Sequence, residues 1–124
     1  MCIRDRGIFI AGPEYNAGIT PLLKNAIDWV SRVKEAGEQP LAAYHDRVFA
    51  VGSASPGGFG GMRSQIVTRQ VLELGCGALV IPEFCTVPAA HQAFAEDGTL
   101  KDERSQRSLT ACCAALVRQA KLIG

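Results

Sequence analysis

The sequence predicts one α/β domain built on a parallel sheet. Three short apolar runs, at 7–11, 48–52 and 78–81, lack the polar alternation of a half-exposed strand. Such runs suit strands that are buried on both faces, as in a parallel sheet. Each run leads into a segment with a helical pattern, so strand, loop and helix repeat in order. The length of 124 residues is that of a single domain, with no internal repeat or boundary.

The first strand is expected at Gly7–Ala11, with Pro13 ending it. Thr20 followed by Pro21 predicts a helix start, because the hydroxyl can cap the first turn and proline fits the first helical position. Gly37 is the expected end of this helix. Four positions form its expected apolar face: Leu23, Ala26, Ile27 and Val30.

The second strand, at 48–52, runs into a loop at 53–61 that is dense in glycine. A helix is expected from about Met62 to Leu74, ended by Gly75 or Gly77.

The third strand is expected at 78–81, where Pro82 closes it, and residues 83–99 have an irregular pattern. A last helix follows. Its expected apolar face consists of Leu109, Cys112, Cys113, Leu116 and Ala120.

Composition limits the class of function. Hydrophobic residues make up 48% and charged residues 20%, which is enough to bury a core. A net charge of +1 indicates neither a nucleic acid nor an anionic membrane surface as the main partner. No apolar run approaches the roughly 20 residues of a membrane helix, and the first residues do not resemble a signal peptide. A soluble cytoplasmic protein is therefore expected.

The cysteines predict neither a metal site nor a disulfide framework. Their count of five is odd and no CxxC spacing occurs, so zinc is not expected. We expect small buried side chains in a reducing compartment. The five are Cys2, Cys76, Cys85, Cys112 and Cys113.

Two loops leave the carboxyl ends of predicted strands, where α/β sheets bind ligands. The loop at 53–61 and the residue before it contribute five glycines, which let a backbone approach a ligand closely and offer N–H groups to it. The loop matches neither the phosphate-binding motif GxxxxGK[ST] nor the dinucleotide-binding motif GxGxxG. The GxSxG motif of serine hydrolases is also absent, so a serine hydrolase is not expected. A flexible strand-to-helix turn is the alternative reading.

The loop at 13–18 combines residues with different chemistry. Pro13 fixes a turn, Tyr15 offers an aromatic face, and Asn16 can hydrogen-bond the edge of a heteroaromatic ring. Glu14 can cap N–H groups of the loop itself. The alternative is an Asx-type turn with a surface tyrosine.

Both loops carry a family resemblance. PEYNAGITPLLKNAIDWVSR (13–32) resembles the PEYN-x-x-x-P-x-x-LKNAIDW signature of the NADPH-dependent FMN reductase family, which has a flavodoxin-like fold and includes quinone, azo and chromate reductases. SASPGGFGGMRSQ (53–65) resembles the second flavin loop of that family, SxSPGxxGGxRxQ. A later IPEF…VP…F…DG-x-L-x-D stretch between Ile81 and Asp102 also matches in order. The resemblance covers nearly the whole chain from Gly7 onward.

The resemblance implies FMN as cofactor and NADPH or NADH as co-substrate, with hydride passing through the flavin to a quinone, azo dye, metal oxyanion or free flavin. It names no catalytic side chain, because the chemistry belongs to the flavin. One wall of the flavin site is implied at Pro13, Glu14, Tyr15 and Asn16. The other wall is implied at Ser53, Ser55, Pro56, Gly57, Gly58 and Gly61.

The resemblance also implies a homodimer or homotetramer. In this family the helix at 22–32 packs against a second subunit, so Trp29 is read either as an interface residue or as ordinary core. Arg63 is read as a contact to NADPH phosphate or a partner chain, or as a solvated helix start.

Compared with the family, the chain resembles an N-terminally truncated, partial flavodoxin-like domain spanning 1–124. The family sheet has the strand order 2-1-3-4-5, and the three runs correspond to strands 3, 4 and 5 of its three-layer sandwich. The family's GSxRxxSxN-type loop for the FMN phosphate has no counterpart here. Residues 1–6 resemble a translated sequencing adapter, the alternative being a genuine short start. We therefore expect the strand at 7–11 to be an exposed apolar edge, and the chain alone to be poorly soluble or to hold FMN weakly.

Two other functions remain open from the sequence. A flavodoxin-type carrier would bind FMN but not NADPH; such carriers are usually strongly acidic, and the net charge of +1 argues against one. A non-enzymatic interaction module or remnant is favoured by the lack of the phosphate loop. NADPH oxidation with a quinone as acceptor would distinguish the enzyme from the carrier.

Overall fold

The computed structural model describes residues 6–123. Cys2 and nearly all of the 1–6 segment lie outside these residues. The sheet has three parallel strands in the order β1-β2-β3: β1 (Gly7–Ala11), β2 (Val48–Ala54) and β3 (Leu79–Val87). The three predicted strands and their parallel arrangement are confirmed.

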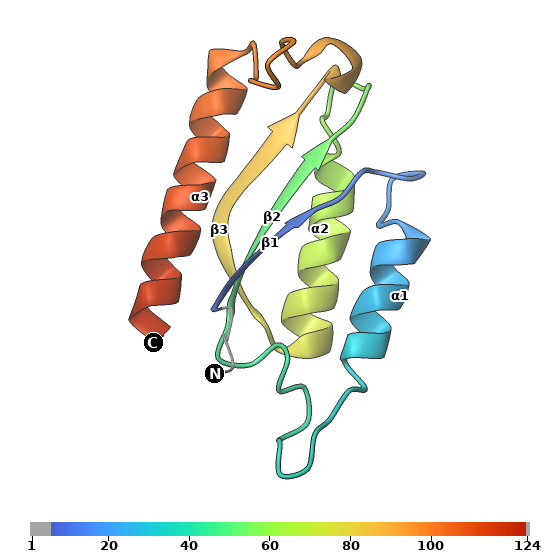
Figure 1. Cartoon of the computed structure of the whole chain (residues 1–124). Coiled ribbons are helices and arrows are strands. Elements are labelled where there is room, and N and C mark those ends of the chain that lie inside the picture. Colours follow the sequence, from blue (N-terminus) through green and yellow to red (C-terminus); the bar gives the residue numbers. More distant parts are fainter. Residues whose placement is uncertain (1–5, 124) are drawn as a thin grey trace.

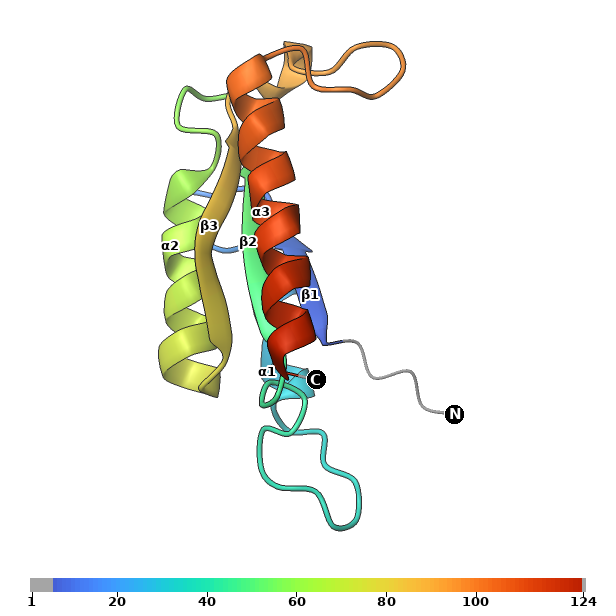
Figure 2. The same cartoon turned by 90° about the vertical axis from the view of Figure 1, so that its left-hand side faces the viewer.

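Helices cover both faces of the sheet, which gives the predicted three layers (Figures 1 and 2). On one face lies α3 (Glu103–Ile123); on the other lie α1 (Pro21–Val30) and α2 (Met62–Gln70). A π-helical turn (Val71–Gly75) continues α2, and a 3-10 helix (Ala90–Gln92) follows β3. No helix in the described range is long and apolar enough to cross a membrane.

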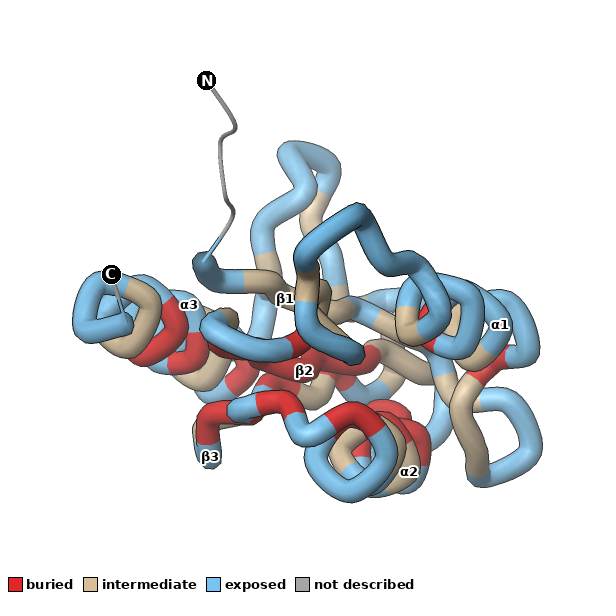
Figure 3. Tube along the Cα trace, turned by 90° about the horizontal axis from the view of Figure 1, so that it is seen from below, coloured by how far each residue is buried: buried red, intermediate tan, exposed pale blue. Residues whose placement is uncertain are grey.

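Alternation along β2 divides the core into two clusters, because successive strand side chains point to opposite faces. Phe49 and Val51 pack with Ile27 and Leu72 on the side of α1 and α2. Val48 and Ala50 pack on the other side, against α3. Figure 3 shows β2 as the buried centre of the molecule. Its apolar run without alternation thus reflects burial on both faces.

β1 is less buried than its sequence predicts. None of its residues is buried, although Ile8 and Ile10 pack on one cluster and Phe9 on the other. The reason is its position: among the described strands β1 pairs only with β2 and so lies at an edge. The expected edge position is confirmed among the described strands, but its apolar side chains Ile8, Phe9 and Ile10 are of intermediate exposure and not fully exposed.

The predicted end of the third strand at Pro82 is wrong, because β3 continues to Val87. The register between β2 and β3 shifts from the pair Phe49↔Val80 to the pair Val51↔Phe84. Pro82 therefore lies in an irregularity of β3, which is at an edge of the described sheet. A proline without an N–H is tolerated at such a bulge.

Side chains from the helices satisfy carbonyl groups along the irregular stretch of β3. Arg69 donates to the carbonyl of Ile81 at 2.7 Å, and Ser108 donates to that of Phe84 at 2.9 Å. These contacts hold β3 between α2 and α3 despite its broken ladder.

The first helix is shorter than predicted. It ends at Val30, not near Gly37, and the hydroxyl of Ser31 donates to the carbonyl of Asp28 at 2.6 Å beside that end. Ile27 is its one buried residue; Ala26 and Val30 are exposed. Trp29 is 69% exposed, so the core reading of this residue is wrong.

The cysteines were predicted to be buried, and three of the four in the described residues are. Cys76, Cys85 and Cys112 are buried, and burial raises the pKa of Cys112 to about 11, which keeps it a thiol at neutral pH. Cys113 was predicted on the apolar face but is exposed. One residue turns a helix by about 100°, so Cys113 points away from the face that Cys112 occupies.

Thr20→Ala should lower the free energy of unfolding by about 1 kcal/mol, because Thr20 is the N-cap of α1. Its hydroxyl oxygen accepts from the N–H of Leu23 at 3.2 Å and the residue is 8% exposed. Urea unfolding followed by circular dichroism measures the change. Thr20→Ser keeps the oxygen and is the control; equal losses in both variants would contradict the capping role.

Candidate functional site

The two loops singled out by the sequence lie at the same end of the sheet, beyond the carboxyl ends of β1 and β2 (Figure 1). We call residues 12–19 the first loop and residues 55–61 the glycine loop. A side-chain contact between Glu14 and Arg63 joins the first loop to the start of α2. The structure therefore brings the two predicted walls together.

The first loop contains a tight turn. The N–H of Tyr15 donates to the carbonyl of Gly18 at 3.1 Å, and the N–H of Gly18 donates back at 3.0 Å. Asn16 and Ala17 both have positive φ, 49° and 64°, as in a type I′ turn, where asparagine is favoured. Tyr15 is 59% exposed and Asn16 is exposed. Their side chains are therefore accessible to a ligand.

The glycine loop presents bare backbone at its tip. Ser55 accepts from the N–H of Gly57 at 3.2 Å, and the N–H of Gly60 donates to the carbonyl of Gly57 at 3.3 Å. Gly57 and Gly58 are exposed, and nothing lies within 4 Å of the position that a Cβ of Gly58 would take. The backbone at Gly58 is therefore accessible to a flat ligand, with the exposed ring of Phe59 beside it in the chain.

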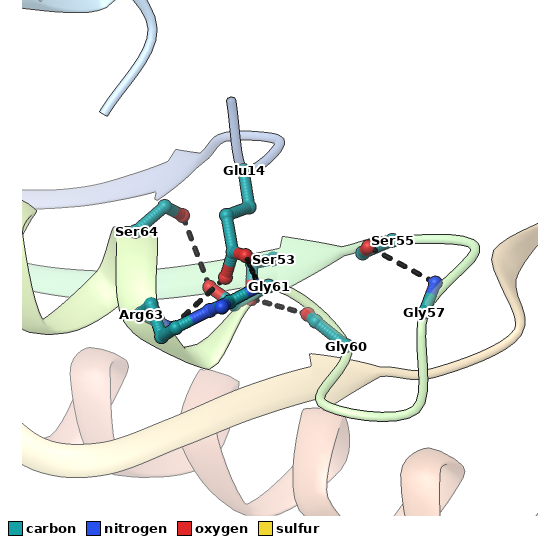
Figure 4. A network of polar contacts seen from close by, with 8 residues as sticks. All are labelled: Glu14, Ser53, Ser55, Gly57, Gly60, Gly61, Arg63 and Ser64. Carbon is teal, nitrogen blue, oxygen red and sulfur yellow. Dashed lines mark hydrogen bonds and ion pairs between the residues drawn. The ribbon is translucent and has the colours of Figure 1, made fainter. Parts of the chain in front are cut away.

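A buried polar network fixes the base of the glycine loop, and Figure 4 shows its contact between Ser53 and Gly60. The hydroxyl of Ser53 donates to the carbonyl of Gly60 at 2.6 Å and accepts from the Nε2 of Gln65 at 2.7 Å. The same Nε2 donates to the carbonyl of Cys85 at 2.6 Å. Gln65 and Ser53 are 4% and 7% exposed, so the network is shielded from water.

Gln65 was not among the predicted site residues. It is the last residue of SASPGGFGGMRSQ, and that position in the motif was the available signal. Gly60 was also missed. It has φ 58°, and a Cβ there would lie 2.9 Å from the backbone nitrogen of Pro88.

The ten predicted site residues divide by exposure. Six are exposed: Pro13, Tyr15, Asn16, Pro56, Gly57 and Gly58. Glu14 and Ser55 are intermediate, and Ser53 and Gly61 are buried. The first group can meet a ligand, whereas the buried pair shapes the loop.

Glu14 and Arg63 connect the first loop electrostatically to the start of α2, which directly follows the glycine loop. One carboxylate oxygen of Glu14 accepts from the backbone N–H of Arg63 at 3.1 Å, and the other pairs with its guanidinium. The hydrogen bond from the guanidinium, and then its charge, lower the pKa of Glu14 below its ordinary value. Arg63 also lies over the ring of Phe59, 5.7 Å from its centroid. Its side chain is 57% exposed, and a contact to NADPH or a partner stays a prediction.

An apolar hollow of about 350 Å³ adjoins the bases of both loops. It lies at the carboxyl ends of the three strands and is bounded on its far side by residues that follow β3. Its lining consists of Phe9, Ala11, Gly12, Pro13, Gly52, Ser53, Ala54, Cys85, Val87, Phe94, Leu100 and Leu109. Within the described residues, no group of three or more His, Cys, Asp or Glu side chains could hold a metal ion.

A parallel α/β sheet with two ligand-accessible loops at the carboxyl ends of adjacent strands is the arrangement of a nucleotide- or flavin-binding protein. Residues 4–92, which include both loops, match the family model described as NADPH-dependent FMN reductase. The chain belongs to the NADPH-dependent FMN reductase family.

Two relatives have related descriptions. The chain is 43% identical over 109 residues to an NAD(P)H:quinone oxidoreductase of Solanum tuberosum, covering 86% of this chain and 52% of the relative. It is 38% identical over 100 residues to an NAD(P)H-dependent FMN reductase of Pseudomonas aeruginosa, covering 80% and 50%. The chain thus spans about half the length of these relatives.

A solved structure supports the same fold. FerB, a flavoenzyme NAD(P)H:(acceptor) oxidoreductase from Paracoccus denitrificans, superposes with a TM-score of 0.73 at 27% sequence identity. The match covers 96% of this chain and 63% of FerB. The predicted flavodoxin-like fold is confirmed, and the chain matches part of the length of FerB.

Proposed function

We propose that this chain carries the ring-binding part of an FMN-dependent NAD(P)H oxidoreductase that reduces a quinone, a flavin or a similar small-molecule acceptor. The observation that carries the proposal is the juxtaposition of two family loops at one end of the sheet, where Glu14 of the first loop contacts Arg63 at the start of the helix that follows the glycine loop. Family membership and the descriptions of the quinone and FMN reductases support it.

The exposed residues fit the isoalloxazine ring of FMN. Tyr15 offers an aromatic face, and Gly58 leaves open space beside bare backbone. Aromatic faces and free N–H groups are what a flat heteroaromatic ring with polar edges requires. We propose that these loops hold the ring edge, whereas the family's phosphate-binding motif has no counterpart in this sequence.

When bound, FMN would supply hydride transfer between NAD(P)H and the acceptor. The residues of this chain would orient the ring and keep one of its faces accessible. No acid–base side chain is required of the chain for that role.

We also propose self-association through α1 in the assembled enzyme. Leu22 and Trp29 are 80% and 69% exposed on this helix, an apolar surface that suits a subunit contact. A homodimer or homotetramer is the proposed assembly.

Titration of FMN into the purified chain, followed by quenching of flavin fluorescence, tests the proposal. We expect saturable binding with a Kd on the order of micromolar or weaker. Charge-assisted phosphate contacts are among the strongest, and this sequence has no counterpart of the family motif that makes them. A chain joined to the N-terminal strand–helix units of the Pseudomonas aeruginosa relative should bind more tightly and oxidise NADPH with a quinone as acceptor. Failure of both chains to bind FMN would reject the proposal.

The same assay separates a second class of function. FMN binding by the joined chain without NADPH oxidation would indicate a flavodoxin-type carrier. The net charge of +1 favours the reductase, because such carriers are usually strongly acidic.

A further inference from the structure

One side chain links the first loop to the first turn of α2, two segments that are far apart in the sequence. Glu14 and Arg63 are 49 residues apart, yet Glu14 bonds both the backbone and the guanidinium of Arg63 (Figure 4). Each carboxylate oxygen of Glu14 therefore has a partner on α2.

The start of α2 lacks a cap of its own. Its N-cap residue is Gly61, which has no side chain and makes no side-chain cap hydrogen bond. The first N–H groups of a helix need acceptors from outside the helix, and a carboxylate there is favoured by the helix dipole. Glu14 accepts from Arg63 in the first turn, so a residue of the first loop performs the capping.

The low exposure of its side chain distinguishes Glu14 from its neighbours. Its side chain is 7% exposed, whereas Pro13, Tyr15 and Asn16 are exposed. Its carboxylate is turned toward α2, where both oxygens contact Arg63.

We propose that Glu14 is a positioning residue, whose carboxylate latches the first loop to the first turn of α2 and so sets the spacing between Tyr15 and the glycine loop. The latch itself is a property of this chain. Its effect on flavin affinity rests on the proposed function.

Amide hydrogen exchange of the chain without FMN tests the latch directly. In Glu14→Ala, amides of residues 13–18 and 57–64 should exchange about 10-fold faster together, since both segments lose their mutual support. Glu14→Gln keeps the shape and one acceptor oxygen, and should show a smaller increase in both segments. This milder variant also keeps the test valid if the alanine variant fails to fold.

Glu73→Gln is the matched control. Glu73 pairs with Arg69 at 2.9 Å, but both residues belong to the same helical segment and join no loops. Exchange in residues 13–18 and 57–64 should stay within about 2-fold of wild type. Unchanged exchange in Glu14→Ala, or an increase confined to one of the two segments, would overturn the latch.

The FMN titration then tests positioning. Glu14→Ala should raise the Kd for FMN about 10-fold with Glu73→Gln unchanged. Faster exchange with an unaltered Kd would overturn the positioning role. If wild type binds no FMN even when joined to the relative's N-terminal units, the proposed function fails, and the exchange experiment still decides the latch.

The pH dependence gives an independent signature. Arg63 is the charged group that faces Glu14 in the described structure, and its hydrogen bond lowers the pKa of Glu14. The latch should therefore be complete above the ordinary carboxyl pKa and be lost as pH falls through the lowered pKa of the folded state. The NMR amide signal of Arg63 should report this transition, and Glu14→Gln should abolish it; a transition that persists in that variant would contradict the latch.

Discussion

Gly61→Ala is expected to lower the free energy of unfolding by about 2–4 kcal/mol, because it combines an unfavourable backbone conformation with a steric overlap. Gly61 has φ 83°, and a Cβ there would lie 2.7 Å from the Cβ and 2.8 Å from the Oγ of Ser53. Ser53 cannot easily move, since its hydroxyl is bonded to the carbonyl of Gly60 and to Gln65. The base of the glycine loop must therefore distort.

Gly58→Ala is the matched control in the same loop. Nothing lies within 4 Å of the position that its Cβ would take, so the free energy of unfolding should change by less than about 0.5 kcal/mol. Urea unfolding of the two variants measures the difference. Equal stability would show that the buried network does not fix the loop in solution.

Leu72→Ala should cost about 2–5 kcal/mol of folding free energy, the range for truncating a fully buried leucine. Leu72 is 0% exposed and packs in the cluster formed by α1, α2 and one face of the sheet. Removing its side chain leaves a cavity in this cluster, beneath the π-helical turn that continues α2. The start of α2 carries the contact to Glu14, so the loss also weakens the support of the site.

Leu74→Ala is the control for Leu72→Ala. Leu74 lies two positions further along the same π-helical turn but is 82% exposed. Its truncation should change the free energy of unfolding by less than about 0.5 kcal/mol. Similar losses in both variants would contradict the packing of this π-helical turn in the core.

The sequence predicted the fold better than the ends of its elements. The apolar run that begins at Val48 has no alternating polar residues, and it correctly indicated a central strand, because both faces of β2 are covered. Pro82 misled the prediction, since a proline is read as a strand end but here occupies an irregularity at an edge. The early end of α1 at Val30 was missed because no glycine or proline marks it.

The candidate site was predicted in outline and not in its internal contacts. Glycine content, residue chemistry and the family motifs located both loops. The pairing of Glu14 with Arg63 was not predicted, because it depends on how β1 and β2 place residues 49 positions apart. Burial of Ser53 was missed for a similar reason: its partners Gly60 and Gln65 become neighbours only once α2 packs on the sheet.

The central claim is that the two loops form one flavin-binding site, and NMR titration of the 15N-labelled chain tests it most directly. Addition of FMN should shift the amides of Tyr15, Asn16, Gly57 and Gly58 together, and riboflavin should shift the same amides if the loops hold the ring. His45, which follows α1 in the chain and precedes β2, is expected to stay unperturbed. Shifts that avoid both loops, with either ligand, would contradict the account.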